Sequence, residues 1–212
     1  MSRRAELTLK QEIVKTMALL FQRERITPTG GNISARPHGS DHFWITPSGV
    51  FKGDLKIRDL VKVTIEGQVS SARFKPSVET PLHSGIYQTR DDVNAIIHAH
   101  SPVILGLALA GIEIKPVTPE SALLVGEVPI VQFEPPGTEA LADGMVEALK
   151  SHQVAVMQNH GVVAVGKTML EALNRLEIVD LTARIMTVTH IWGRTPSLSA
   201  TELEQLKGLP NA

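Results

Sequence analysis

The spacing of apolar positions along the chain alternates between the helical period and short runs typical of strands. Thr8 and Gln11 form a capping-box pattern, and the apolar residues after them recur at helical spacing, which predicts a first helix ending near Arg23. A longer apolar stripe after Thr168 predicts the longest helix of the chain, which ends near Gly193. Further helices are predicted over residues 79–89, 103–110 and 138–150, with a short one after Ser199.

Short apolar runs bounded by glycine, proline and polar residues predict β-strands between these helices. Two pairs of runs are separated by turn-rich segments and are expected to form hairpins: 33–36 with 43–46, and 61–65 with 69–71. Further strands are expected at residues 93–100, 128–133, 154–158 and 162–165. Because helices alternate with strands, and tight turns join several strand pairs, the sequence predicts a layered α/β domain with a mixed or mostly antiparallel sheet.

The length and charge of the chain limit the class of protein it can be and the kinds of partner it can bind. A chain of 212 residues is expected to form a single domain, residues 1–212. Its net charge of -1 argues against a nucleic-acid partner, and the absence of cysteine excludes disulfide scaffolds, thiolate metal sites and cysteine nucleophiles. No apolar run is long enough to cross a bilayer, and no apolar signal core follows Met1, so we expect a cytoplasmic protein without a membrane partner.

The histidines carry the first chemical signal. His98 and His100 lie two residues apart at the end of an apolar run, so on a strand their rings project from the same face. Two imidazoles placed in this way can hold one divalent metal, although ordinary hydrogen-bonded histidines at a strand end have the same spacing. His160 lies in a turn between two apolar runs, where Gly161 permits close backbone approach. Three imidazoles with an open position are typical of catalytic zinc, but spacing alone leaves open whether His160 reaches the pair.

A carboxylate and three loops are the other candidates. Glu79 opens a predicted helix, where Ser77 can cap the free N–H groups, and its carboxylate is either an inert helix-start charge or an acid/base beside a metal. His83, one turn later, either supports that site or belongs to the core. Three loops combine small residues with exposed backbone N–H groups, as phosphate sites and ordinary turns both do: Gly30–Gly31–Asn32, Thr46–Pro47–Ser48–Gly49 and Lys75–Pro76–Ser77.

Taken in order, these motifs resemble the class II aldolase/adducin family, and most closely its L-fuculose-phosphate aldolase branch. The matching segments are Gly30–Ser34, Ile45–Gly49, Lys75–Glu79, Ile97–Ser101 and Gln158–Gly161, and the predicted helix from Glu171 onward also fits. The resemblance therefore covers the chain from roughly Leu7 to Trp192. The resemblance implies a three-layer α/β/α fold, in which a central, mainly antiparallel sheet is flanked by helices. It also implies a homotetramer with sites near the subunit borders.

The resemblance also assigns roles to residues. It implies that His98, His100 and His160 bind Zn2+, or Mn2+, Fe2+ or Co2+ in its place, and that Glu79 is both a displaceable metal ligand and the catalytic acid/base. The implied phosphate-binding residues are Asn32, Ser48, Gly49 and Ser77, with Gly31 and Thr46 beside them. The implied substrate is a sugar phosphate. A ketose 1-phosphate, such as L-fuculose 1-phosphate, would be cleaved into dihydroxyacetone phosphate and a short aldehyde through a metal-stabilised enediolate.

Two positions depart from that branch. Val78 stands where the branch carries a second serine, which removes one hydroxyl from the implied phosphate site. The branch uses tyrosines as proton donor and lid, but the single tyrosine here, Tyr87, lies elsewhere, and the corresponding region offers only Thr118 or Glu120. The family also contains pentulose-phosphate 4-epimerases, dehydratases, decarboxylases and non-catalytic adducin-like scaffolds, and these remain alternatives.

Overall fold

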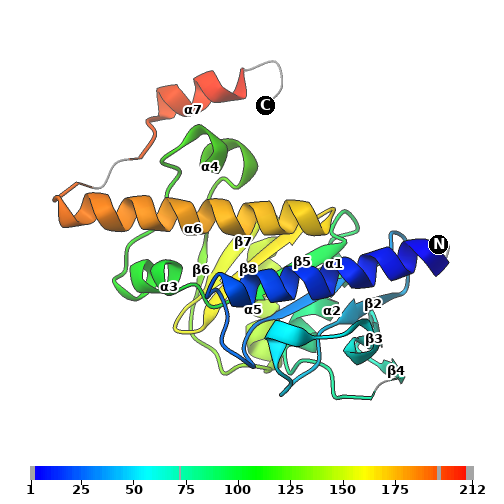
Figure 1. The fold of residues 1–212 in the computed structure, drawn as a ribbon. Coiled ribbons are helices and arrows are strands. Elements are labelled where there is room, and N and C mark those ends of the chain that lie inside the picture. The colour runs from blue at the N-terminus through cyan, green and yellow to red at the C-terminus, as the bar shows by residue number, and fades with distance from the viewer. Residues whose placement is uncertain (1–2, 72, 195–196, 209–212) are drawn as a thin grey trace.

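The computed structural model describes residues 3–71, 73–194 and 197–208, in which one sheet lies between two layers of helices (Figure 1). The sheet order in these residues is β4-β3-β2-β1-β5-β8-β7-β6, and every pairing is antiparallel except the parallel β6–β7 pair. This confirms a mainly antiparallel, mixed sheet. The strands are β1 (Asn32–Ala35), β2 (His42–Ile45), β3 (Val61–Thr64), β4 (Val69–Ser71), β5 (Ala95–Ala99), β6 (Ile130–Val131), β7 (Val154–Met157) and β8 (Gly161–Gly166).

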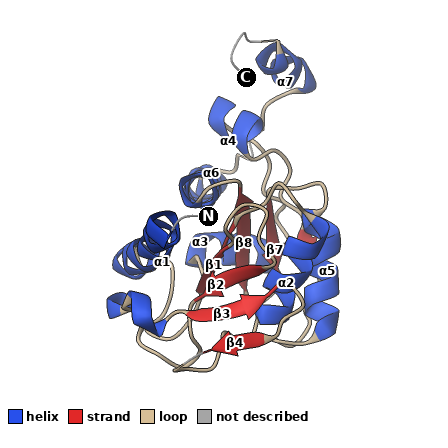
Figure 2. Ribbon diagram, turned by 90° about the vertical axis from the view of Figure 1, so that its right-hand side faces the viewer, coloured by secondary structure: helices blue, strands red, loops and turns tan. Residues whose placement is uncertain are grey.

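Helices cover both faces of the sheet, which confirms the three-layer α/β/α arrangement (Figure 2). Helices α1, α3 and α6 pack on one face, and α2 and α5 pack on the other. The short helix α7 packs on α4, away from the sheet (Figure 1). The α-helices are α1 (Arg3–Gln22), α2 (Thr80–Thr89), α3 (Pro102–Leu109), α4 (Pro119–Leu124), α5 (Glu139–Leu149), α6 (Met169–Ile191) and α7 (Ala200–Lys207), and the 3-10 turns are η1 (Lys52–Asp54) and η2 (Ile57–Asp59).

Each face of the sheet has its own apolar core because strand side chains alternate. On β5, Ile97 and Ala99 join the core under α1, α3 and α6, whereas Ile96 joins the core under α2 and α5. Strands β5, β7 and β8 are buried along their whole length, since helices cover both of their faces. The end of β5 therefore projects from the most rigid part of the molecule.

Helix starts show where local patterns succeed. Ser101, Thr138, Thr168 and Ser199 each accept a backbone N–H at the start of α3, α5, α6 and α7, as their sequence pattern predicts. The capping box expected at Thr8 is wrong, because α1 already begins at Arg3 and the Thr8 hydroxyl donates to the Arg4 carbonyl inside the helix. The acidic Glu6 in the first turn favours this earlier start.

Two further differences concern the second half of the chain. Helix α4, which Thr118 caps, was not predicted, and the strand expected at 128–133 shortens to Ile130–Val131. Prolines flank this segment on both sides, at positions 129, 135 and 136, and proline cannot donate to a sheet ladder. Among the described helices, none combines the length and the apolar character that a membrane crossing requires.

Candidate metal centre and phosphate site

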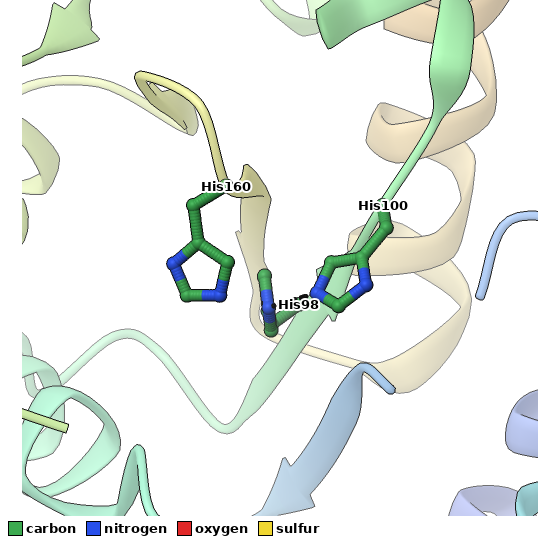
Figure 3. A group of neighbouring side chains, drawn as sticks. All are labelled: His98, His100 and His160. Carbon is green, nitrogen blue, oxygen red and sulfur yellow. Dashed lines mark hydrogen bonds between the residues drawn. The ribbon is translucent and has the colours of Figure 1, made fainter. Parts of the chain in front are cut away.

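Three histidines from two parts of the sheet meet at one point (Figure 3). His98 and His100 come from the end of β5, and His160 comes from the turn between β7 and β8. The ring centroid of His98 lies 4.6 Å from that of His100 and 4.9 Å from that of His160. One nitrogen from each ring lies within 4.8 Å of the other two, so the three could share one metal ion. The structure thus brings together the residues whose proximity the sequence left open.

The backbone of the β7–β8 turn explains how His160 comes so close. A Cβ atom at Gly161 would lie 2.5 Å from both the Ala99 carbonyl oxygen and His98 Cε1, so only glycine fits there. The preceding Asn159 has a φ of 61°, a left-handed conformation that asparagine tolerates better than most residues. The sequence Asn159–His160–Gly161 is therefore required by the close approach of the turn to β5.

Burial keeps the imidazoles of His98 and His100 in the neutral form that binds a cation. His98 Nδ1 lies 3.2 Å from the Val162 carbonyl oxygen, to which it donates, so Nε2 carries a lone pair and faces the cluster. Burial, together with the neighbouring His160, lowers the pKa of His98 to about 3. Burial and the adjacent His98 also lower the pKa of His100 to about 4. Neutral imidazoles are what a divalent cation requires, and an all-imidazole set suits the zinc class of ions.

Glu79 lies directly against this cluster. It occupies the residue before α2 and is 4 % exposed. Its Oε2 lies 3.2 Å from His98 Nε2, and its Oε1 lies 3.1 Å from His160 Nε2. Oε1 is buried and has no hydrogen-bond partner in the described residues, whereas Oε2 accepts a 2.6 Å bond from Asn32 Nδ2. The carboxylate is thus within reach of a shared ion and has one oxygen available.

His83, whose role the sequence left open, lies behind Asn32. His83 is fully buried, and its Nε2 lies 2.5 Å from Asn32 Oδ1. The amide of Asn32, which the family resemblance assigns to phosphate binding, is therefore already engaged by Glu79 and His83 and retains one N–H for another partner. His83 supports the site through Asn32.

The three candidate phosphate loops lie side by side at the same end of the sheet. The Ser48 N–H donates to the Lys75 carbonyl at 3.0 Å, and Pro47 forms an isolated β-bridge with Pro76. The Ile33 N–H donates to Thr46 Oγ1 at 3.2 Å, which joins the 46–49 loop to the 30–32 loop.

The candidate residues in these loops differ in exposure. Thr46 and Ser77 are buried, Ser48 is half-buried, and Gly49 is exposed. The Ser77 hydroxyl accepts the Glu79 N–H at 3.3 Å, which ties the third loop to the carboxylate. Gly31 and Gly49 have φ angles of 67° and 66°, which favour glycine. The structure therefore brings all the candidate residues to one end of the sheet, with Ser48 and Gly49 facing outward.

A model of the class II aldolase and adducin N-terminal domain matches residues 11–187 of this chain. The chain belongs to the class II aldolase and adducin family. An L-fuculose phosphate aldolase of Methanocaldococcus jannaschii is 32% identical over 176 residues, which cover 83% of this chain and 94% of that protein. A 3-oxo-tetronate 4-phosphate decarboxylase of Escherichia coli O6:H1 is 32% identical over 212 residues, covering 96% of this chain and 97% of that protein.

The fold comparison agrees with the sequence comparison. A solved L-fuculose 1-phosphate aldolase superposes with a TM-score of 0.88 at 31% sequence identity, covering 94% of each chain. Class II aldolases depend on a divalent metal, and the proteins named above are lyases. The histidine cluster of this chain is consistent with that chemistry.

One charged residue near this candidate site was missed by the sequence reasoning. Lys52 is 1 % exposed, its ammonium donates to the Pro47 carbonyl, and its backbone N–H donates to the Pro28 carbonyl at 2.8 Å. Its side chain thus brings a positive charge next to the 46–49 loop. Burial lowers the pKa of Lys52 to about 8, so it remains charged at neutral pH. A loop lysine is ordinarily exposed, and nothing in the local sequence signalled otherwise.

The structure agrees with both departures from the aldolase branch that the sequence shows. Val78 is 61 % exposed and offers no hydroxyl, and Tyr87 is 1 % exposed within the core under α2. Thr118 accepts the Ser121 N–H at the start of α4, and Glu120 is exposed on the same helix. Within the described part of the chain, neither Thr118 nor Glu120 has a hydrogen bond or ion pair with the histidine cluster.

Proposed function

We propose that this protein is a divalent-metal-dependent carbon–carbon lyase that cleaves a ketose 1-phosphate, such as L-fuculose 1-phosphate, into dihydroxyacetone phosphate and a short aldehyde. The observation that carries the proposal is the meeting of His98, His100 and His160 with Glu79, next to three loops suited to a phosphate group. We assign the three histidines as metal ligands, with Zn2+ as the first choice and Mn2+, Fe2+ or Co2+ as alternatives.

The residues around the cluster have different roles in the proposed reaction. A bound cation would supply Lewis acidity, withdrawing charge from the substrate carbonyl and making the neighbouring C–H acidic. Glu79 Oε1, which is buried and has no hydrogen-bond partner among the described residues, is placed to hold or release the proton at that carbon. The 30–32, 46–49 and 75–77 loops would bind the phosphate with backbone N–H groups and the Ser48 hydroxyl, and the charge of Lys52 supports this role. Binding energy from the phosphate would orient the carbons that react.

A second candidate is decarboxylation of a phosphorylated 3-oxo acid. Aldol cleavage requires a base that removes the proton from the hydroxyl that becomes the aldehyde oxygen, and an acid that protonates the carbon left behind. Loss of carbon dioxide requires only the second of these steps. The only tyrosine of the chain is buried, and burial raises its pKa far above the ordinary value. The Escherichia coli decarboxylase also matches this chain over nearly its whole length. Loss of carbon dioxide from a four-carbon 2-hydroxy-3-oxo acid 4-phosphate, with a proton delivered to carbon 2, would leave the same dihydroxyacetone phosphate.

A substrate screen tests both candidates. Metal-loaded protein would be incubated with ketose 1-phosphates, with 3-oxo-tetronate 4-phosphate and with a pentulose 5-phosphate, and each product would be measured with and without a chelator. Release of dihydroxyacetone phosphate with an aldehyde supports the aldolase, and its release with carbon dioxide supports the decarboxylase. Epimerisation of the pentulose phosphate would favour the epimerase alternative instead.

His160→Ala serves as the matched protein control. Metal content of the purified wild type and of His160→Ala is measured first, because the assigned ligand set predicts about one ion per chain in the wild type and much less in the variant. If neither protein holds a stoichiometric ion and no substrate reacts, the lyase proposal is wrong and the adducin-like scaffold is favoured.

We also propose that the protein is a cytoplasmic homotetramer. Val188, Ile191 and Trp192, at the C-terminal end of α6, are 56%, 78% and 79% exposed and are consistent with an interface between copies. Light scattering coupled to size-exclusion chromatography would report four chains per particle. A monomer at micromolar concentration would contradict this part of the proposal.

A further inference from the structure

A chain of buried polar side chains extends from Glu79 into the core under α2. Glu79 Oε2 is bonded to Asn32 Nδ2 at 2.6 Å, and Asn32 Oδ1 to His83 Nε2 at 2.5 Å. His83 Nδ1 is then bonded to Ser34 Oγ at 2.6 Å, and Ser34 Oγ to the Tyr87 hydroxyl at 2.8 Å. All five residues are at most 4 % exposed.

Two elements place these five side chains in one row. Asn32 and Ser34 are two residues apart on β1 and share one face of the strand. Glu79, His83 and Tyr87 are spaced by four residues at the start of and along α2, so they share one face of the helix. The row therefore follows from the period of a strand facing the period of a helix.

The hydrogen bonds of this row can point in only one direction. Burial lowers the pKa of His83 to about 3, so the ring is neutral and has one donor and one acceptor nitrogen. A carboxylate only accepts, so Asn32 donates Nδ2–H to Glu79 and turns its carbonyl oxygen toward His83. His83 must then carry its proton on Nε2 and accept the Ser34 O–H at Nδ1. The Ser34 oxygen in turn accepts the Tyr87 O–H.

From this one-way order we infer that His83, Ser34 and Tyr87 are positioning residues that act through Asn32 to hold Glu79 Oε2 in place and leave Oε1 free for proton transfer. This inference rests on the proposed function for the role of Glu79 as acid/base. Burying these five polar side chains would destabilise the fold if any of them lacked a hydrogen-bond partner. The row supplies those hydrogen bonds. Proton transfer along the row is not involved, because the Asn32 amide separates the carboxylate from the imidazole.

The first test measures the tautomer of His83 and does not depend on any substrate. Long-range proton–nitrogen correlation spectra of 15N-histidine-labelled, metal-free protein are expected to show His83 as a single Nε2–H tautomer. Ser34→Ala removes the donor to Nδ1 and is expected to shift the Nδ1 resonance while the Nε2–H tautomer persists, because Asn32 Oδ1 still accepts from Nε2. The control is Ser84→Ala, since Ser84 is also a buried serine on α2 but its hydroxyl has no hydrogen-bond partner in the described residues.

A wild-type Nδ1–H tautomer, or an Nδ1 resonance that Ser34→Ala leaves unchanged, would overturn the inference. A single Nε2–H tautomer whose Nδ1 resonance is shifted by Ser34→Ala and not by Ser84→Ala supports it. This outcome is independent of whether the protein cleaves a sugar phosphate, so the inference and the proposed function can fail separately.

The second test uses kinetics with a rescue variant. His83→Leu removes the donor to Asn32 and is expected to lower kcat by about 10–100-fold, the range found for partners behind a metal site, with KM within about twofold. His83→Gln keeps an N–H near the position of Nε2 and is expected to recover most of that loss. Ser34→Ala and Tyr87→Phe lie farther from Glu79 and are expected to lower kcat progressively less.

Metal content and the urea midpoint are measured for each variant so that loss of fold or of metal is recognised. Equal activity of His83→Leu and His83→Gln at equal stability would overturn the inference. The inference would also be overturned if, across the variants, the loss of activity followed the loss of stability and not the distance of the residue from Glu79.

Discussion

Both faces of the sheet bury an apolar core, but strands β1 and β5 direct their polar site residues to one face only. On β1, Ile33 and Ala35 enter an apolar core under α1, α3 and α6, whereas Asn32 and Ser34 face α2 and are hydrogen-bonded to its polar residues. On β5, Ile97 joins the apolar core, and His98 lies one residue later on the opposite face. Both faces therefore stabilise the fold by apolar burial, and the α2 face also carries the polar side chains that lead to the candidate site.

This difference shows how the molecule separates stability from function. Apolar burial is non-directional, so the α1, α3 and α6 face tolerates substitutions of similar volume. A buried hydrogen bond depends on direction and on its partner, so one change on the α2 face leaves other groups unsatisfied. We therefore expect substitutions on the two faces to change different measured quantities.

The largest expected effect is on kcat and comes from the α2 face. Glu79→Gln keeps the shape of the side chain but removes its ability to take a proton, so kcat should fall by about 10²–10⁴-fold. The measurement is steady-state cleavage of whichever phosphorylated substrate the screen identifies. Glu139→Gln is the control, because Glu139 is an exposed carboxylate in the first turn of α5. Near-normal turnover by Glu79→Gln would mean that another group moves the proton.

The next effect is on stability and comes from the opposite face. Leu176 on α6 is fully buried in the apolar core, so Leu176→Ala should lower the free energy of unfolding by about 2–5 kcal/mol. Urea denaturation measures the loss, and kcat per folded molecule should remain within about twofold. A large fall in kcat with metal content intact would show that the two faces are coupled.

The pH dependence of stability should also differ between the faces. His83 is neutral in the folded protein because burial lowers its pKa to about 3, whereas an unfolded histidine binds a proton below about pH 6.5. The stability that depends on neutral His83 is therefore complete above about pH 6.5 and is lost as the pH falls toward 3.

A comparison of metal-free wild type with His83→Gln isolates this titration. The difference in unfolding free energy between them should shift by about 2 kcal/mol against the wild type between pH 7 and pH 5. Urea denaturation at both pH values provides the measurement. A pH-independent difference would show that His83 titrates in the folded protein as it does in the unfolded chain.

The smallest expected effect concerns the outward-facing loops. Ser48→Ala removes one hydroxyl from the proposed phosphate site and should raise KM about tenfold, since a hydrogen bond to a charged group contributes about 1.5 kcal/mol or more. Turnover at saturation should change little. Ser40→Ala, in the turn between β1 and β2, is the control. An unchanged KM for Ser48→Ala would place the phosphate elsewhere.

Local sequence patterns were sufficient for most of the helices and strands. Caps such as Ser101 and Thr138 depend on bonds three residues away, and the hairpins depend on their turns, so both can be recognised in a short window. The same holds for His98 and His100, whose shared face follows from strand alternation. Where several weak local signals competed, as at the start of α1 and around α4, the prediction was wrong or absent.

By itself, the sequence determined the secondary structure, the layered fold and the residue types available for chemistry, because these depend on period, turn residues and composition. Only the tertiary structure decided that His160 meets the β5 pair, that Lys52 is buried beside the loops and that His83 stands behind Asn32. Those contacts join residues far apart in the chain, and they depend on which strands pair and which helix covers them. No short window of sequence contains that information.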